Sequence, residues 1–233
     1  MNHLSKDLTR KFLMLLLACW LFIPLLAQNT KVVSDLGLWT GVEVEKEVKD
    51  DWTFSLKQEL RLKTNMSEVN NYFTQAGVRY KINRNFSLAA KYRFTRNKKK
   101  DLSYQNRSRY SLDLRYKGRL DFLTFYYRLR YQKEVESMRL FDIEEPYEKY
   151  VRNRITVRYT DFKKIEPYLS GELFQLFQQY EFPRIDYMRI EAGIRIATGD
   201  LGEFKLAWGF NRELQEANPA TFYAVRINYT FEL

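Results

Sequence analysis

The sequence predicts an all-β protein, a closed antiparallel up-and-down transmembrane β-barrel of about 10–12 strands. Apolar and charged residues alternate along most of the chain, which is the pattern of strands with one apolar and one polar face. Most candidate strands have ten to thirteen residues, whereas soluble strands typically have about five or six and membrane-spanning strands about nine to eleven. Short connections alternate with longer polar ones, as expected of periplasmic turns and outside loops.

The first 27 residues have the features of an export signal. Three Arg and Lys residues occur among the first eleven positions, and residues 12–27 form an apolar run. This run is short for a membrane-spanning helix, and its basic start fits a signal peptide. We therefore expect cleavage after Ala27, which leaves a single barrel domain at 28–233 in the bacterial outer membrane. Lipoprotein processing at Cys19 is the alternative, although the apolar run continues for eight residues beyond that cysteine.

Eleven candidate strands follow in order. Residues 86–95, 109–116 and 188–196 show the alternation most clearly, because every second residue is apolar and its neighbours are mainly charged or polar. The full set covers 35–48, 52–63, 70–82, 86–96, 104–116, 121–132, 148–159, 165–177, 185–197, 203–213 and 221–233.

The connections between these strands alternate in length. The short ones are 49–51, 83–85, a turn around Gly118, a turn at Asp161, and 198–202. The longer ones are 64–69, 97–103, 133–147, 178–184 and 214–220. No linker or shift in composition divides the chain, which supports one domain.

The strand count leaves two alternatives open. Backbone groups cannot stay unpaired in lipid, so a membrane sheet must close, and bacterial barrels usually close with an even number of strands. Either the last ten candidate strands form the barrel, or a twelfth strand exists that the pattern does not reveal.

The apolar face of the strands predicts contact with lipid. Leu112, Leu129 and Ile194 lie on it, and aromatic residues concentrate near strand ends, as in the girdles at membrane interfaces. These aromatic residues include Trp52, Tyr80, Tyr92, Phe94, Tyr116, Tyr131, Tyr159 and Tyr229. A soluble periplasmic lipid-binding barrel, with the apolar face turned inward, is an alternative.

The polar face is rich in arginine and would line the lumen. The candidate lumen residues are Arg107, Arg109, Arg115, Arg128, Arg130, Arg152, Arg154, Arg158, Arg189 and Arg195. Fewer acids share this face: Glu43, Glu45, Glu59, Asp113, Glu172 and Glu191. The lumen is either filled by ion pairs in a structural barrel or forms an electropositive passage for small solutes, and any water path through it should favour anions.

The composition excludes several kinds of chemistry. The only histidine, His3, and the only cysteine, Cys19, both lie in the export segment. The mature chain therefore has no His- or Cys-based nucleophile or zinc site. We assign no catalytic, cofactor-binding or metal-binding residue and no cofactor, and we expect that the protein is not an enzyme. An outer-membrane enzyme that acts on lipid or peptide without histidine is the alternative.

The expected partners follow from location. They are outer-membrane lipids and the outer-membrane assembly machinery, because the alternating residues 221–233 resemble the C-terminal recognition strand of its substrates. The formal charge of +10 does not indicate nucleic-acid binding, because the chain is exported and has no nucleic-acid-binding motif. The sequence leaves the oligomeric state open.

A family resemblance runs through most of residues 36–233. Its motifs are Leu38-Trp39-Thr40-Gly41, the segment 54–61, Arg79-Tyr80, Tyr92-Arg93, Asn106-Arg107, the segment 127–131 and Val151-Arg152-Asn153-Arg154. Their order resembles the bacterial family called domain of unknown function 2490 (DUF2490), common in Bacteroidetes. The resemblance implies an outer-membrane β-barrel and brings no catalytic residues with it.

Overall fold

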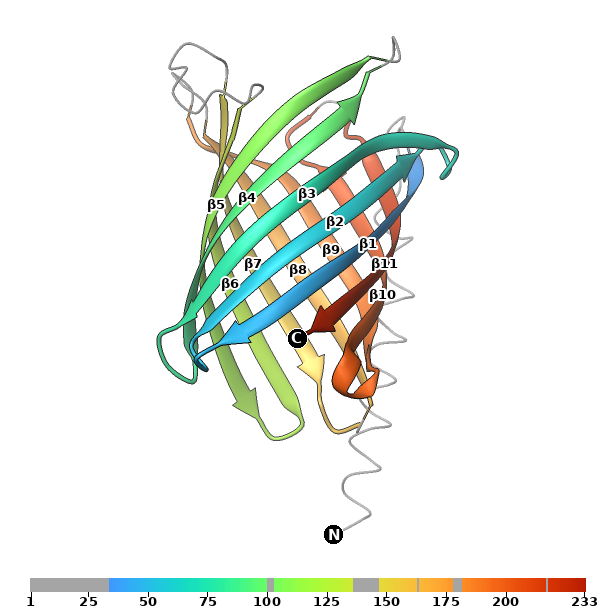
Figure 1. The fold of residues 1–233 in the computed structure, drawn as a ribbon. Coiled ribbons are helices and arrows are strands. Elements are labelled where there is room, and N and C mark those ends of the chain that lie inside the picture. The colour runs from blue at the N-terminus through green and yellow to red at the C-terminus, as the bar shows by residue number, and fades with distance from the viewer. Residues whose placement is uncertain (1–33, 100–102, 136–146, 163, 178–181, 217) are drawn as a thin grey trace. The chain divides into compact units, whose positions relative to one another are not determined.

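The computed structural model describes residues 34–99, 103–135, 147–162, 164–177, 182–216 and 218–233. The predicted export signal at 1–27 and the lipoprotein alternative at Cys19 lie outside these residues. The strands are β1 (Ser34–Val48), β2 (Trp52–Lys63), β3 (Glu68–Lys81), β4 (Phe86–Lys98), β5 (Tyr104–Leu120), β6 (Leu123–Val135), β7 (Tyr147–Tyr159), β8 (Ile165–Phe177), β9 (Arg184–Ala197), β10 (Gly202–Glu213) and β11 (Thr221–Glu232) (Figure 1). A 3-10 turn, η2 (Gly199–Leu201), precedes β10. No helix within the described ranges is long and apolar enough to cross a membrane.

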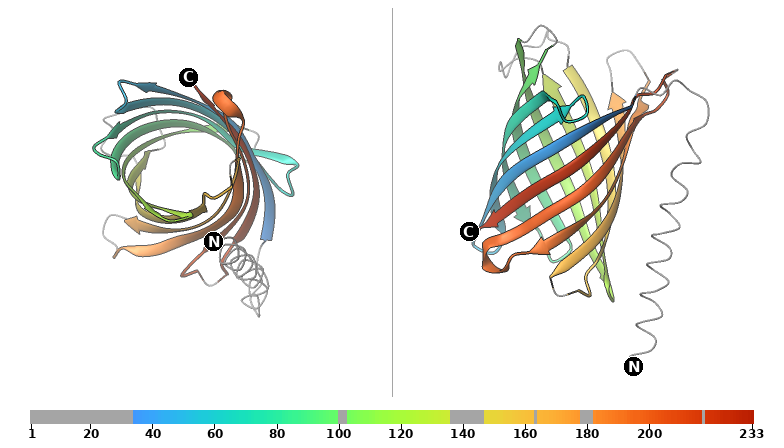
Figure 2. Two further views of the ribbon diagram at one scale, coloured as in Figure 1. Left: turned by 90° about the horizontal axis from the view of Figure 1, so that it is seen from below. Right: turned by 90° about the vertical axis from the view of Figure 1, so that its right-hand side faces the viewer.

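The strands close into a barrel, as predicted. Each strand pairs with its neighbours in the sequence, and β1 pairs with β11 to complete the ring seen along the barrel axis in Figure 2. All eleven predicted strands take part, so the ten-strand alternative is wrong, and the described residues hold no twelfth strand.

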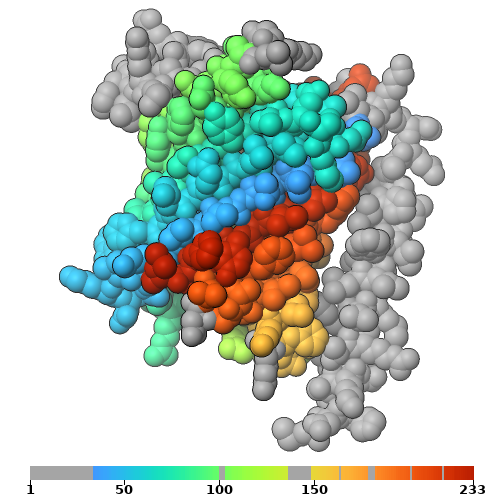
Figure 3. Space-filling model, turned by 45° about the vertical axis from the view of Figure 1, so that its right-hand side comes forward, coloured from blue at the N-terminus to red at the C-terminus, as the bar shows by residue number. Residues whose placement is uncertain are grey.

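The prediction of a wholly antiparallel sheet is wrong at one seam. The pairing of β1 with β11 is parallel and runs from Ser34 opposite Thr221 to Glu45 opposite Glu232. The other ten strand pairs are antiparallel. The odd number of strands is the cause, because hairpin connections reverse direction at every step and the eleventh strand runs the same way as the first. The outer surface of this seam is continuous between the blue β1 and the red β11 (Figure 3).

The two ends of the barrel differ in the length of their connections. One end has the connections 49–51, 82–85, 121–122, 160–164 and 198–201 and is called the turn end, and the other has the connections 64–67, 99–103, 136–146, 178–183 and 214–220 and is called the loop end. The strand β1 begins at the loop end, where the Asp35 carboxylate accepts backbone N–H bonds from Thr64 and Asn65 at 2.9 Å each. The chain finishes at the turn end, where the Leu233 N–H donates to the Glu45 carbonyl at 2.9 Å.

One predicted turn lies elsewhere. Gly118 does not turn the chain but pairs with Phe125 inside the β5–β6 ladder. The reversal occurs at residues 121–122, and Asp121 adopts a left-handed conformation with φ 47°. The ladder continues past Gly118 because β6 offers backbone partners as far as Leu123, opposite Leu120.

The two faces of the strands lie as the alternation predicts. Leu112 and Leu129 are exposed on the outer surface, with exposed fractions of 62% and 36%. The predicted outer aromatic residues Trp52 and Tyr80 form a ring pair at 4.7 Å near the turn end. Tyr159 differs from the expectation because rings from two neighbouring turns cover it, which leaves it 5% exposed.

Two glycines shape the inner face at the closing seam. A Cβ atom on Gly37 would stand 2.3 Å from the Phe222 ring, and one on Gly41 would stand 2.6 Å from the Gln58 carbonyl oxygen. Both glycines share the inner face of β1 with Trp39, which stacks on Phe222 at 5.9 Å between ring centroids. The missing side chains thus leave room for an aromatic contact that joins β1 to β11 inside the barrel.

Candidate functional site

The candidate site is the lumen of the barrel. It contains a cavity of about 840 Å³, which seventeen Arg and Lys side chains and seven Glu side chains of the described residues line. All ten arginines predicted for the lumen lie on this cavity: Arg107, Arg109, Arg115, Arg128, Arg130, Arg152, Arg154, Arg158, Arg189 and Arg195. The period of two alone explains their placement, because residues two apart on a strand share one face.

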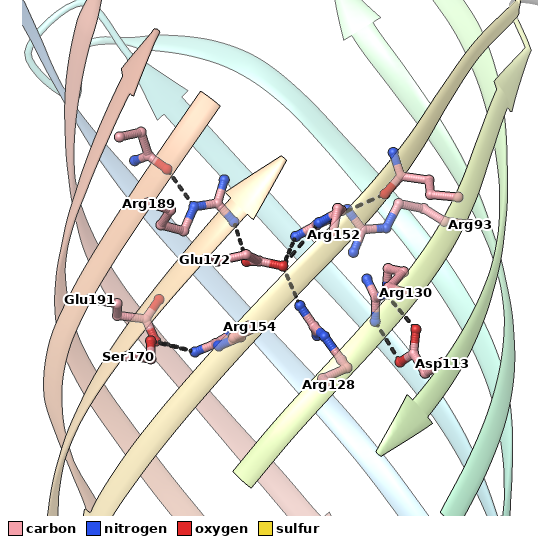
Figure 4. A network of polar contacts seen from close by, with 12 residues as sticks. Arg93, Asp113, Arg128, Arg130, Arg152, Arg154, Ser170, Glu172, Arg189 and Glu191 are labelled. Carbon is pink, nitrogen blue, oxygen red and sulfur yellow. Dashed lines mark hydrogen bonds and ion pairs between the residues drawn. The ribbon is translucent and has the colours of Figure 1, made fainter. Parts of the chain in front are cut away.

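Three buried carboxylates, each at most 3% exposed, anchor part of this positive charge (Figure 4). Asp113 on β5 accepts two bonds from Arg130, at 2.5 Å from Nε and 2.8 Å from Nη2. Its Oδ2 also accepts a bond from Arg115 at 3.0 Å. The exposed fraction of Asp113 is only 2%, so these charge-assisted bonds offset the cost of its burial.

Glu172 on β8 is the second buried carboxylate. Arg128 and Arg152 approach its Oε1 at 2.5 Å and 2.9 Å. Arg189 lies 3.8 Å from its Oε2. These arginines come from β6, β7 and β9, so one carboxylate ties together strands on both sides of β8.

Glu191 on β9 is the third and has no exposed surface. Its carboxylate accepts bonds from the Tyr168 hydroxyl at 2.8 Å, from Lys205 at 3.0 Å and from Arg154 at 3.2 Å. Arg226 of β11 also donates to it. Four donors from four strands therefore converge on a single buried charge.

Arginines and aromatic rings also alternate across the inside of the barrel. Arg93 stacks on Phe73 with its guanidinium carbon 3.6 Å from the ring centroid. Arg61 lies over both Phe73 and Trp39, at 5.0 Å and 4.1 Å. The series of stacked contacts continues with Arg189 over Trp39 at 5.2 Å, Arg189 over Phe174 at 5.0 Å and Arg152 over Phe174 at 4.1 Å, each measured from the guanidinium carbon to the ring centroid.

We call these seven residues the cation–π belt. One of its contacts, between Trp39 and Arg189, joins β1 to β9. The strands β10 and β11 lie between these two strands in the sheet, so the two side chains meet inside the curved sheet. Each cation–π contact contributes about 0.5–2 kcal/mol, depending on how far it is desolvated. The belt therefore holds its guanidiniums in fixed positions inside the lumen.

Several lumen residues were missing from the predicted site. Arg61, Arg93, Lys91, Lys205 and Arg226 also line the cavity. Their signal was present in the sequence, since each lies on the charged face of an alternating strand. Trp39 and Phe174 were also absent from the predicted site, although both line the cavity. A large aromatic residue on a polar face is interpreted as an outward side chain until its cationic neighbours are known.

The arrangement is suited to the electrostatic binding of an anion. The described residues contain no group of three or more His, Cys, Asp or Glu side chains placed to hold a metal ion. The buried carboxylates each contact cations, so they are held as acceptors. Positive groups that line a cavity of about 840 Å³ favour the entry of an anion.

Comparison with known proteins assigns the chain to a family. The sequence profile of the family described as "Protein of unknown function (DUF2490)" matches residues 36–217. The chain belongs to this family. The fold of this DUF2490 protein is also similar to that of a solved structure described as a "Bacterial polysaccharide outer membrane secretin".

The likeness to the solved structure concerns the fold. The TM-score is 0.50 at 14% sequence identity, and the similarity covers 75% of this DUF2490 chain and 62% of the other chain. No curated protein matches the sequence. The barrel fold and the outer-membrane neighbour are compatible with an outer-membrane location for this DUF2490 protein.

Proposed function

We propose that this DUF2490 protein is an outer-membrane β-barrel whose electropositive lumen admits small anions. The observation that carries the proposal is the excess of positive charge on the cavity, seventeen cationic side chains against seven glutamates among the described residues. Even with the three buried carboxylates counted, cations remain in the majority. A low-dielectric wall strengthens the resulting potential.

Membrane insertion is supported by the outer surface. Its exposed residues include Leu56, Leu112, Ile155 and Trp208, and large contiguous apolar surfaces are rare on soluble monomers. The strands have 12 to 17 residues, enough to span a bilayer at a tilt. The inward charged face also opposes the soluble lipid-binding alternative, which needs an apolar interior.

A non-conducting structural barrel is the second candidate. The cation–π belt favours it, because the belt places Trp39, Phe73 and Phe174 inside the lumen with guanidiniums stacked on them. Long arginine side chains fill space readily. In both candidates the role is one of passage or support, and we propose no catalytic activity.

Fractionation of the membrane tests the location. We expect the protein in the outer-membrane fraction and a change of electrophoretic mobility after boiling, because a closed barrel stays folded in detergent until it is heated. A cleaved export signal predicts an N-terminus at Gln28 in the same preparation, to be read by mass spectrometry. Recovery in the soluble periplasmic fraction without a mobility shift would contradict the proposal.

Reversal potentials test the passage of anions. Purified protein in a planar bilayer with unequal KCl concentrations should give a reversal potential of the anion-selective sign. Screening extends over about 10 Å at 0.1 M salt, so raising the salt should weaken the selectivity. Cation selectivity would refute the proposal, and absence of conductance would favour the structural barrel.

A further inference from the structure

Two of the seventeen lumen cations differ from the rest. Fifteen of them lie within 4.0 Å of a carboxylate oxygen of the described residues. Lys91 and Arg93 have no such carboxylate in that part of the chain. They are adjacent inward positions of β4, so their Cα atoms lie about 7 Å apart along one strand.

From this geometry we infer that Lys91 and Arg93 form the oxyanion-binding position of the lumen. The ligand class is a compact oxyanion, such as a phosphate or a carboxylate. Arginine binds two oxygens with a planar fork and lysine supplies a mobile point charge. The inference deepens the proposed function by naming the position at which an entering anion is held.

The Arg93 guanidinium is fixed by uncharged partners. Its Nε and Nη2 both donate to Gln75 Oε1, at 3.0 Å and 2.8 Å. Its plane also packs on Phe73. Arg109, directly opposite on β5, is held by Glu134 instead. The charge of Arg93 is thus oriented but not neutralised.

The lysine has room to reach into the same space. On one side β3 presents Gly77 opposite Lys91, and on the other β5 presents Ser111. A Cβ atom on Gly77 would stand 3.3 Å from Lys91 Cγ, so the stem of the lysine lies over the glycine. A larger residue at position 77 would occupy that path.

The surrounding charges leave the position positive. Arg115 of β5 and Arg130 of β6 line the same cavity as Lys91. The carboxylates of Glu43 and Asp113 both lie beyond ion-pair distance of Lys91. Asp113 is already engaged by Arg130 through two bonds. Arg115 and Arg130 share the carboxylate of Asp113, which leaves Lys91 and Arg93 as the two cavity cations without an ion-paired carboxylate among the described residues.

Equilibrium binding tests the inference without requiring conductance. Inorganic phosphate is titrated into purified full-length protein in lipid-free detergent micelles, with the heat recorded by calorimetry. The double variant K91Q/R93Q should bind phosphate about tenfold or more weakly than the unmodified protein, which corresponds to about 1.4 kcal/mol. The charge-preserving variant K91R/R93K should retain binding.

The matched control is R96Q/K98Q. It removes the same two residue types at the same spacing from the same strand, but Arg96 and Lys98 lie on the opposite face of β4 and do not line the cavity. It should bind phosphate within about twofold of the unmodified protein, since the lumen charge is unchanged. The mobility shift on boiling confirms that each variant is folded.

The outcomes separate this inference from the proposed function. Unchanged phosphate binding in K91Q/R93Q, or no binding by the unmodified protein, overturns the inference even if the bilayer shows anion selectivity. A loss of phosphate binding in K91Q/R93Q, with binding retained in K91R/R93K and R96Q/K98Q, supports the inference. This holds even if no variant conducts and the passage proposal fails.

Discussion

Replacement of Glu191 by Gln is expected to destabilise the folded barrel by about 3–5 kcal/mol. The carboxylate is fully buried and compensates Arg154, Lys205 and Arg226. Removing its charge leaves these cations facing each other in the interior without a counter-charge. Unfolding by urea in lipid vesicles, followed by tryptophan fluorescence, measures the loss.

The control is Glu166→Gln on the neighbouring strand. Glu166 pairs with Arg158 at 2.8 Å, but 34% of its side chain is exposed. Such an ion pair contributes about 0–1 kcal/mol, so this variant should unfold close to the unmodified protein. Equal stability of the two variants would contradict the role of Glu191 as the centre of a buried network.

Replacement of Leu112 by Arg is expected to prevent assembly of the barrel into the membrane. Leu112 is the middle residue of β5 and is 62% exposed on the outer face. A lipid-facing arginine at the midplane of the bilayer costs about 2–4 kcal/mol. The measurement is the fraction of protein that shows the folded mobility in outer-membrane preparations.

Leu120→Arg provides a matched comparison on the same strand and the same face. Leu120 is 63% exposed, but it lies at the turn end of β5. An arginine near the interface costs about 0–1 kcal/mol, so this variant should assemble. If both variants assembled equally well, the outer face would be in contact with water, and the membrane proposal would be wrong.

The sequence by itself determined the strands and their faces. Alternation is a local property, because consecutive side chains of a strand point to opposite sides whatever the strand pairs with. Leu112 could therefore be placed outside and Arg115 inside without knowledge of the neighbours. The position of the turn predicted at Gly118 was wrong because the end of a strand is not a local property. It depends on how far the partner strand continues.

Only the tertiary structure decided how the barrel closes and which charges are neutralised. Trp39 lies opposite Arg226 because β1 pairs in parallel with β11, and no local pattern relates residues so far apart in the chain. Arg130 has a buried carboxylate beside it and Lys91 does not, although both lie on charged faces of alternating strands. Strand register and the curvature of the closed sheet set these distances, and the chain acquires both only when the ring is complete.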